Sequence, residues 1–335
     1  MGDGEWRSRI GIALTNALVM MAFPRSDINP SIRYPSRESC VGGPPRSIPL
    51  RNTGADMHNL SVYTATYNLS LIGFDWKSTL TNWTAFLQGH SQIVIAVNTS
   101  TDSTYEDICS FICELKKDQR NQTDYQVVKT DIPLSNPLFD GLIKNEALKR
   151  CTGEFATLLD IDEVVPLTTR QAWEGAMEFL SRSTYDALLI PSIDLFHDEK
   201  SFKSLNSKWY IHKNRPHIIR GRVGFAARED GSTDISRSDT CEAIYANGDL
   251  VRHTSLLDPR FPDDLKLQYM AQGGIPYVFH TGWIHREQRL KQSAFWAPVW
   301  RARDNSDKVK ELTPEEFDAI EYKPHGLPDW RIDYD

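Results

Sequence analysis

Two aspartates that follow an apolar run are the residues of this sequence best placed to do chemistry. Residues 155–159 read Phe-Ala-Thr-Leu-Leu, and Asp160 and Asp162 follow directly, separated by one residue. On an extended backbone, residues i and i+2 point to the same side, so both carboxylates can converge on one ion at the end of a strand. Mn²⁺ and Mg²⁺ take oxygen ligands and often keep phosphate oxygens in their shell. The pair therefore predicts a divalent-metal site that also holds a diphosphate, although an isolated Asp-x-Asp also fits a solvated acidic turn.

The elements that must position these carboxylates alternate between strand-like and helix-like segments. This pattern predicts an α/β fold with a mostly parallel central sheet flanked by helices. In such sheets ligands bind at the carboxyl ends of the strands, where Asp160 and Asp162 are expected. The expected strands are 60–66, 92–97, 125–129, 155–160 and 187–191, and the expected helices are 75–88, 105–117, 138–151 and 169–182.

Four segments resemble family-2-like glycosyltransferases. Residues 62–68 look like the first strand and loop of that family, and residues 97–104 are similar to the loop after its second strand. Residues 144–163 carry Lys-Asn-x-Ala, Cys-Thr-Gly and Leu-Asp-Ile-Asp-Glu in the family's order, and residues 278–286 contain a late His-x-Gly-Trp. The resemblance implies a GT-A-type fold with a mixed α+β acceptor-side lobe.

The same resemblance implies an activity. The chain would move a sugar from a nucleoside-diphosphate sugar to a hydroxyl acceptor, which is a glycan, a lipid or another molecule, with Mn²⁺ or Mg²⁺ as cofactor. Inversion is the leading hypothesis for the stereochemistry, and retention stays open. Two alternatives remain: a nucleotidyltransferase and a non-catalytic glycan-binding relative. The nucleotidyltransferase alternative lacks support, because this sequence has no Gly-rich phosphate loop with a following Lys after the first expected strand.

Residues on the nucleotide side follow from this resemblance. Asn98 stands where the family usually has an Asp near the base and ribose, and an amide both donates and accepts hydrogen bonds where a carboxylate only accepts. Asp102 is expected to shape its loop by bonding backbone amides. Lys144 either reaches a phosphate or solvates a helix face. The residues expected to border the nucleotide are Thr64, Thr66 and Asn68.

The late segment is expected to supply the third metal ligand. His280 follows the apolar run 275–279, and a neutral imidazole is an acceptable ligand for Mn²⁺. The cation would then join segments about 120 residues apart, with His285 as the reserve ligand. Trp283 could stack on the sugar or acceptor, and Arg286 could contact a phosphate. Packing roles for His280, Trp283 and Arg286 remain open.

An inverting transfer needs a carboxylate that deprotonates the acceptor hydroxyl. The candidates in the second half of the chain are Asp194, Asp198, Asp239 and Glu242, and Asp239 is preferred because its cluster follows the basic run 220–222. Aromatic residues in this half suit either a carbohydrate platform or an ordinary core. They are Trp209, Tyr210, Trp283, Phe295, Trp296 and Trp300.

Composition sets broader limits. The net charge of −7 gives no reason to expect a nucleic-acid partner. Five widely spaced cysteines favour a reducing, cytoplasmic compartment over a disulfide framework. The apolar stretch 10–23 is shorter than the roughly 20 residues of a transmembrane helix, which leaves membrane-peripheral association open. The expected parts are an irregular arm (1–57), a nucleotide-sugar-binding half (58–165), an acceptor-side half (166–303) and a C-terminal extension (304–335).

Overall fold

The computed structural model describes the part of the chain that carries the predicted chemistry. All described residues belong to the compact unit Asp56–Asp335. The expected arm 1–57 lies outside the described residues. The described residues are 60–87, 91–118, 120–136, 139–214, 218–220, 243–245, 253–257, 261–304, 310–328 and 330.

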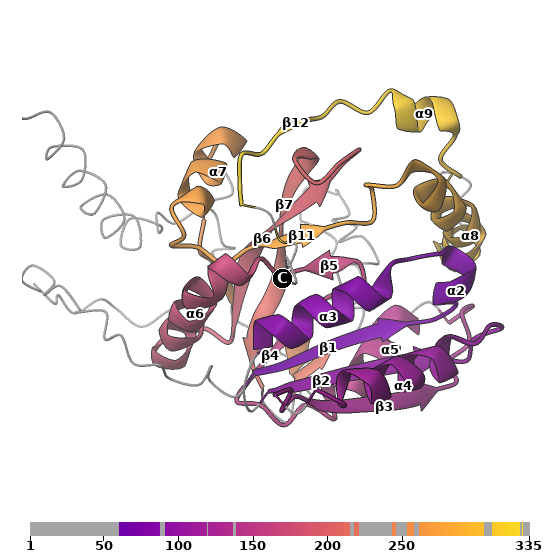
Figure 1. Cartoon of the computed structure of the whole chain (residues 1–335), viewed down its shortest axis with the longest axis horizontal. Helices are drawn as coiled ribbons and strands as arrows, with labels where there is room; N and C mark the ends of the chain where they lie inside the picture. The colour runs from indigo at the N-terminus through magenta and orange to yellow at the C-terminus, as the bar shows by residue number, and fades with distance from the viewer. Residues whose placement is uncertain are drawn as a thin grey trace, which may run out of the picture. The chain divides into compact units, whose positions relative to one another are not determined.

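One large mixed sheet organises the described residues (Figure 1). Its strand order is β3-β2-β1-β4-β7-β6-β11-β5, with β10 paired to β6 and β12 paired to β7. Among these strands only β5 and β7 run against the others, so the predicted mostly parallel sheet is confirmed. The strands are β1 (Leu60–Thr66), β2 (Gln92–Asn98), β3 (Asp124–Thr130), β4 (Phe155–Leu158), β5 (Glu163–Val164), β6 (Ala187–Leu195), β7 (Ser201–Lys213), β10 (His253–Ser255), β11 (Val278–His280) and β12 (Lys323–Pro324); a separate pair joins β8 (Ile218–Arg220) and β9 (Ala243–Tyr245).

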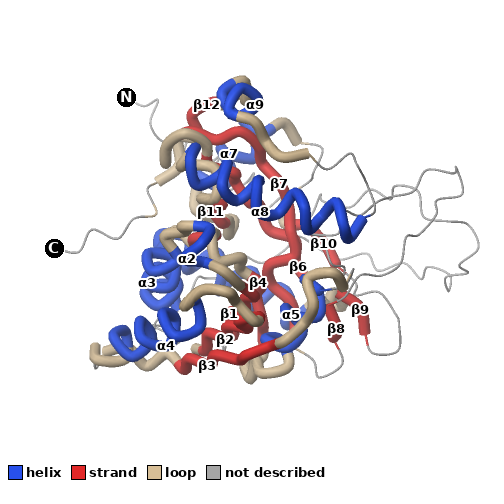
Figure 2. Tube along the Cα trace, turned by 90° about the vertical axis from the view of Figure 1, so that its right-hand side faces the viewer, coloured by secondary structure: helices blue, strands red, loops and turns tan. Residues whose placement is uncertain are grey.

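Helices cover both faces of this sheet, as expected for an α/β fold. Side chains of α3, α4 and α6 pack on one face, and side chains of α5 and α8 pack on the other. In the view of Figure 2, α7 and α9 lie at the end of the sheet far from β3. The helices are α2 (Leu69–Ile72), α3 (Trp76–Leu87), α4 (Thr104–Leu115), α5 (Phe139–Leu148), α6 (Arg170–Arg182), α7 (Asp263–Ala271), α8 (Arg286–Asp304) and α9 (Pro314–Asp318), with a 3₁₀ turn at Leu167–Thr169.

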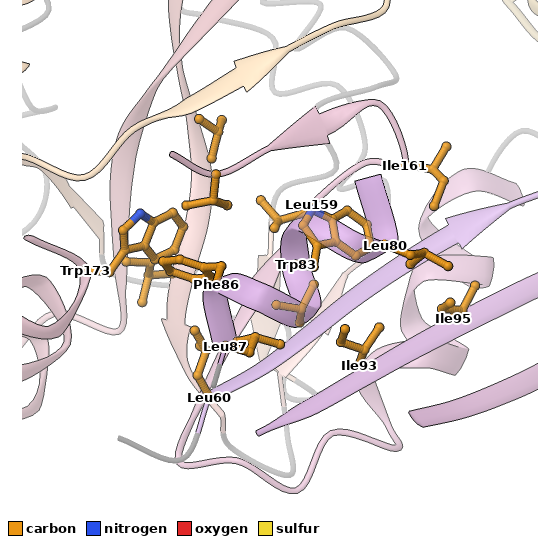
Figure 3. Close-up of a cluster of buried hydrophobic side chains, with 14 of the residues drawn as sticks. Leu60, Leu80, Trp83, Phe86, Leu87, Ile93, Ile95, Leu159, Ile161 and Trp173 are labelled. Atoms are coloured by element: carbon orange, nitrogen blue, oxygen red, sulfur yellow. The ribbon is translucent and has the colours of Figure 1, made fainter. Parts of the chain in front are cut away.

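The alternation of side chains along β1 builds two hydrophobic layers. Leu60 and Val62 join the cluster under α3, whereas Tyr63 joins the cluster under α5. Trp83 and Trp173 are fully buried in the first cluster, where Figure 3 shows them on either side of Phe86. Removing a buried aromatic side chain of this kind typically costs about 3–5 kcal/mol. These layers hold the strand ends that carry the candidate site.

The observed elements extend the predicted ones in two places. β6 continues to Leu195 beyond the expected end at Pro191, because its ladder with β7 is maintained on both sides of the proline. The sequence of residues 324–330 predicts a loop or tail, but Pro324 pairs with β7, together with Lys323, as a short edge strand. The run Thr-Pro-Glu-Glu at 313–316 predicts a helix start, and the structure shows a capping box between Thr313 and Glu316 there.

Two further observations concern the environment of the chain. None of the helices within the described ranges combines the length and apolar character needed to cross a membrane. Cys109, Cys113 and Cys151 are free thiols, while Cys40 and Cys241 lie outside the described residues.

Candidate functional site

The acidic segment after β4 is a closed turn. β4 ends at Leu158, and the Glu163 amide donates to the Asp160 carbonyl at 2.8 Å. The fully buried Glu163 carboxylate accepts the backbone amide of Asp160 at 2.9 Å. The predicted extension of the strand through Asp160 is therefore wrong, because these two bonds bend the chain. The two carboxylates consequently have different surroundings: the Asp160 side chain is 37% exposed and the Asp162 side chain 8%.

Buried contacts with α3 fix the chain on the far side of this turn. Trp83 Nε1 donates to the Glu163 carbonyl at 2.7 Å. The Asn82 side chain accepts the Val165 amide at 2.8 Å and donates to the Val165 carbonyl at 3.0 Å. A buried polar group left unpaired costs about 1–3 kcal/mol, so these bonds strongly favour one path for residues 163–165.

Lys144 lies against Asp160 at the edge of the sheet. Its side chain is 8% exposed, and its Nζ lies 3.2 Å from Asp160 Oδ1 and 3.2 Å from Asp140 Oδ2. Of the two alternatives drawn from the sequence, a solvated helix face does not fit a buried ammonium group. A phosphate-binding role for Lys144 stays a prediction.

His280 joins two carboxylates from distant parts of the chain. Its Nε2 lies 2.9 Å from Asp162 Oδ2, and its Nδ1 lies 2.8 Å from Asp194 Oδ1. The Asp162 contact spans 118 residues of sequence. The expected proximity of His280 to the acidic motif is thus present, and Asp194 is an additional member of the cluster.

The register of four neighbouring strands produces this cluster. His280 on β11 pairs with Glu163 on β5 and with Asp194 on β6. Asp194 in turn pairs with Ser204 on β7, whose hydroxyl donates to Asp194 Oδ2. A polar row therefore crosses the sheet next to the acidic turn. Strand pairing sets its members at fixed spacing, since neighbouring strands lie about 4.7–4.9 Å apart.

Charge–charge contacts shift the acid–base behaviour of the cluster. Burial disfavours charge on His280, but the Asp162 charge and hydrogen bonds with Asp162 and Asp194 outweigh burial and raise the pKa of His280 to about 10. Burial raises the pKa of Asp194, but His280 and Lys203 pull it well below the usual range. Burial lowers the pKa of Arg289 to about 10, against the attraction of Asp162 and Asp194. The two carboxylates thus favour the protonated form of His280.

The residues after His280 close the cluster from one side. The Thr281 amide and hydroxyl both donate to the Asp162 carbonyl, at 2.7 Å and 2.9 Å. A Cβ atom at Gly282 would lie 2.5 Å from Asp162 Oδ2 and 3.0 Å from His280 Nε2. A glycine is therefore required at position 282 for Asp162 and His280 to keep this contact.

Trp283 is flanked by two cations. Lys203 Nζ and the Arg289 guanidinium carbon each lie 3.6 Å from the Trp283 ring centroid. Lys203 Nζ is also 3.5 Å from Asp194 Oδ2. Phe317 of α9 stacks near the same indole, with ring centroids 6.5 Å apart. The indole is thus part of the wall of the cluster, and its expected stacking on a sugar stays a prediction.

The basic residues of α8 take different positions. Arg286 forms two bonds of 2.8 and 2.9 Å with exposed Asp318, outside the polar row. Arg289, one turn later, lies over Trp283, and its Nε is buried without a hydrogen-bond partner among the described residues. His285, the reserve ligand, is exposed. Arg289, and not Arg286, therefore lies beside the cluster, and the phosphate contact of Arg286 stays a prediction.

The predicted nucleotide side is held by local hydrogen bonds. Asn98 is the last residue of β2. Its side-chain oxygen accepts a hydrogen bond from the Ile132 backbone amide, and its side-chain nitrogen donates to the Ile132 carbonyl, both at 2.8 Å. Asn68 adopts φ 52°, and its side chain accepts the Thr101 amide at 2.8 Å. Thr64 and Thr66 are buried on β1. Asn98 thus already uses both ends of its amide on the chain itself.

The loop after β2 behaves as expected. Asp102 accepts the backbone amides of Thr104 and Leu71, each at 3.0 Å. Burial acts to raise the pKa of Asp102, but the Thr104 hydroxyl and these backbone amides outweigh it and lower the pKa. The predicted loop-shaping role of Asp102 is confirmed.

Of the four candidate catalytic carboxylates, the structure describes Asp194 and Asp198. Asp239 and Glu242 lie outside the described residues. Both Asp194 oxygens are engaged, one by His280 and the other by Ser204 and Lys203. Asp198 sits in the turn between β6 and β7, where it accepts the Lys200 amide at 2.8 Å.

Two aromatic residues of α8, Phe295 and Trp296, are half-buried and pack against other aromatic rings. Phe295 and Trp296 each lie 5.3 Å from the Tyr67 ring, centroid to centroid, and Trp296 stacks on Phe139 at 6.0 Å. Of the two alternatives for this pair, the core reading fits these contacts. The side chains of Trp209, Tyr210 and Trp300 are outside the described set.

The donor atoms suit a small divalent cation in type. Asp160, Asp162 and His280 offer carboxylate oxygens and one imidazole nitrogen, which bind Mn²⁺ and related ions. Within the described residues, no three His, Cys, Asp or Glu side chains are already arranged around a common metal position. Asp162 and His280 present one oxygen and one nitrogen to each other across 2.9 Å, so a cation that replaced the proton between them would meet two ligands.

Comparisons with known proteins add weak similarities. No family model and no curated protein matches the chain. S. aureus TarS 1–349 is 17% identical with a TM-score of 0.37, over 78% of this chain and 69% of that chain. Its complex with UDP is 17% identical with a TM-score of 0.36, over 77% and 76%. The mannosyltransferase PcManGT from Pyrobaculum calidifontis, in complex with GDP-Man and Mn²⁺, is 15% identical with a TM-score of 0.35, over 78% and 68%. Because these identities and scores are low, the functional proposal rests on the residues of this chain.

Proposed function

We propose that the chain is a divalent-metal-dependent glycosyltransferase of the GT-A type. It would transfer a sugar from a nucleoside-diphosphate sugar to a hydroxyl group of a glycan, lipid or other acceptor. The observation that carries the proposal is the contact between Asp162 and His280. It joins the acidic turn after β4 to the late His-x-Gly-Trp segment, as the family resemblance implies.

In this proposal three side chains hold the cation. Asp160, Asp162 and His280 are the ligands of Mn²⁺ or Mg²⁺, and binding would separate Asp160 from Lys144. The bound ion would neutralise the charge that develops on the leaving diphosphate. Lys144, which also contacts Asp140 at 3.2 Å, would then donate to a phosphate oxygen in place of Asp160, since an ammonium group is a strong donor to anions. Arg289 is a second cation of the cluster and would balance the same charge from the side of α8.

Acceptor activation is assigned to the segment between β8 and β9. An inverting transfer needs a carboxylate that takes the proton of the acceptor hydroxyl as that oxygen attacks the sugar. Asp239 is the proposed base, with Glu242 as the reserve. Asp194 is less suited to this role, because its oxygens already accept hydrogen bonds from His280 and Ser204.

A ligand screen tests the proposal directly. The protein with Mn²⁺ is heated in the presence of UDP-, GDP- and dTDP-sugars, because a ligand bound only by the native state raises its melting temperature. We expect stabilisation by one nucleotide class that depends on Mn²⁺, together with slow Mn²⁺-dependent hydrolysis of that donor. The absence of both across the panel would overturn the proposal.

The same screen separates the alternative functions. A non-catalytic relative would be stabilised by a glycan or a donor but would release no nucleoside diphosphate. A nucleotidyltransferase would instead release pyrophosphate from a nucleoside triphosphate in the presence of a sugar phosphate. Asp160→Ala and Asp162→Ala should abolish the Mn²⁺-dependent stabilisation if these residues hold the ion.

A further inference from the structure

The two ring nitrogens of His280 have different partners. Nε2 faces Asp162 at 2.9 Å, and Nδ1 faces Asp194 at 2.8 Å. A neutral imidazole carries one proton, and the nitrogen that keeps it cannot also bind a cation. The position of that proton therefore decides whether a lone pair is available beside Asp162.

Asp194 is firmly held in the middle of the polar row. It lies on β6, between β7 and β11, and its side chain is 9% exposed. Ser204 donates to Oδ2, and Lys203 Nζ lies 3.5 Å from the same oxygen. Oδ1 is directed to His280 Nδ1. Because contacts from both neighbouring strands restrict the carboxylate, it presents a fixed acceptor to one nitrogen of the ring.

A carboxylate in this position selects one tautomer of the neutral ring. It accepts hydrogen bonds but cannot donate one, so a lone pair on Nδ1 would face the lone pairs of Asp194. A proton on Nδ1 removes this repulsion and leaves the lone pair on Nε2, next to Asp162. Outer carboxylates that orient ligating histidines in this way typically change metal affinity 10- to 100-fold.

We propose that Asp194 is a positioning residue that keeps the proton of neutral His280 on Nδ1 and thereby directs Nε2 toward the cation. The inference rests on the metal-binding part of the proposed function. In this role Asp194 orients His280 and does not deprotonate the acceptor hydroxyl. Ser204 and Lys203 support this role indirectly, because they hold the carboxylate in place.

Direct metal titration tests the positioning role without an activity assay. Mn²⁺ alone is titrated into the full-length protein, and the electron paramagnetic resonance signal of free Mn²⁺ gives the affinity. We expect Asp194→Ala to weaken binding about 10- to 100-fold. Asp194→Asn should fall between this variant and wild type, because its amide oxygen can still accept from Nδ1. The matched control is Asp186→Asn, a fully buried aspartate just before the other end of β6.

The outcomes separate this inference from the proposed function. If Asp162→Ala loses affinity while Asp194→Ala keeps it, the positioning role is overturned and the metal site stands. If both variants bind Mn²⁺ like wild type, the metal site itself is wrong. Equal losses of Mn²⁺ affinity in Asp194→Asn and Asp186→Asn would indicate that both substitutions only loosen β6. That result would also overturn the role of Asp194.

A measurement on the wild-type protein covers the case in which the Asp194 variants do not fold. Protein labelled with ¹⁵N in its histidines is saturated with Mg²⁺, and long-range ¹H–¹⁵N correlation spectra show which ring nitrogen carries the proton. The His280 signals are assigned by their loss in His280→Gln. We expect the proton on Nδ1, and a proton on Nε2 would overturn the proposal.

Discussion

Asn98 and His280 each end a strand of the same sheet, but they are held by different kinds of partner. Asn98 bonds to the backbone of Ile132, which lies just after the neighbouring strand β3. His280 bonds to the side chains of Asp162 and Asp194, which lie 118 and 86 residues away. The predicted nucleotide side is thus fixed mainly by hydrogen bonds between side chains and backbone groups 31 to 34 residues away. The late segment is fixed by charged contacts between distant strands.

This difference has a physical consequence for ligand binding. Neutral bonds to the backbone are already satisfied and gain nothing when a ligand arrives. In the proposed metal site the charged cluster would exchange partners, because a divalent cation would replace a proton between an imidazole and a carboxylate. The nucleotide side is therefore expected to control stability, and the late segment is expected to control metal binding.

The largest effect is expected at the acidic turn. Asp162→Ala and Asp160→Ala should each lower metal-dependent turnover about 100-fold or more, since each removes a carboxylate that offsets the diphosphate charge. Hydrolysis of the donor found in the nucleotide-sugar screen is the measurement. Asp118→Ala removes an exposed aspartate paired with Arg120 and serves as the control. More than about a tenth of wild-type turnover in both variants would refute the metal assignment.

A smaller effect is expected where the late segment approaches the turn. In Gly282→Ala the added methyl group would meet Asp162 Oδ2 at 2.5 Å and His280 Nε2 at 3.0 Å, so the Asp162 carboxylate or the His280 ring must shift. We expect Mn²⁺ affinity to fall about 10-fold, in the range seen when ligand geometry is disturbed. Gly175→Ala is the control, because a Cβ at Gly175 in α6 meets no atom within 4 Å. That control should raise stability slightly, by up to about 1 kcal/mol.

On the nucleotide side the expected change is in stability. Asn98→Ala removes the bonds to Ile132 and leaves its amide and carbonyl without that partner, which should cost about 2 kcal/mol of unfolding free energy. Urea denaturation measures this change, and Mn²⁺ affinity should stay at the wild-type value. Thr99→Ala, at an exposed neighbour, should change stability by less than about 0.5 kcal/mol. A loss of Mn²⁺ affinity in Asn98→Ala would contradict the division between the two regions.

The smallest effect concerns pH on the same side of the molecule. Burial raises the pKa of Cys151 to about 12 from an ordinary value of 9.0. The neutral thiol therefore favours the folded state below pH 9, and this contribution is lost as pH rises toward 12. Linkage gives about 1.4 kcal/mol per pH unit at most. Between pH 8 and 10, Cys151→Ala should lose roughly 1 kcal/mol less stability than wild type. If the urea midpoints of the two proteins change equally with pH, the Cys151 thiol does not contribute to the pH dependence of stability.

Local patterns were enough to predict the first region. β1 spans the predicted residues 60–66, because alternating apolar residues serve both faces of the sheet. The position of the acidic motif beside the sheet was also predictable, although the bonds from Glu163 that close the turn were not apparent from an apolar run alone.

The second region depends on information that spacing does not carry. Asp194 meets His280 because β6 lies between β7 and β11, and that order arises from long-range strand pairing. Arg286 and Arg289 both follow the Gly-Trp pair, and only the rotation of α8 decides which of them faces Trp283. Gly282 could have been noticed as a small residue beside a candidate ligand. The contribution of Lys203 had no sequence signal, because β7 brings it back to the site.

The sequence separation between members of the polar row also determines when their contacts can form during translation. Asp162 leaves the ribosome 118 residues before His280. At translation rates of about 5–20 residues per second, the delay is roughly 6 to 24 seconds. During this time the nucleotide-side strands can pair, while the Asp162 carboxylate lacks its imidazole partner. Because distant pairings are slow to form, the end of the sheet that carries His280 should be among the last parts to become native.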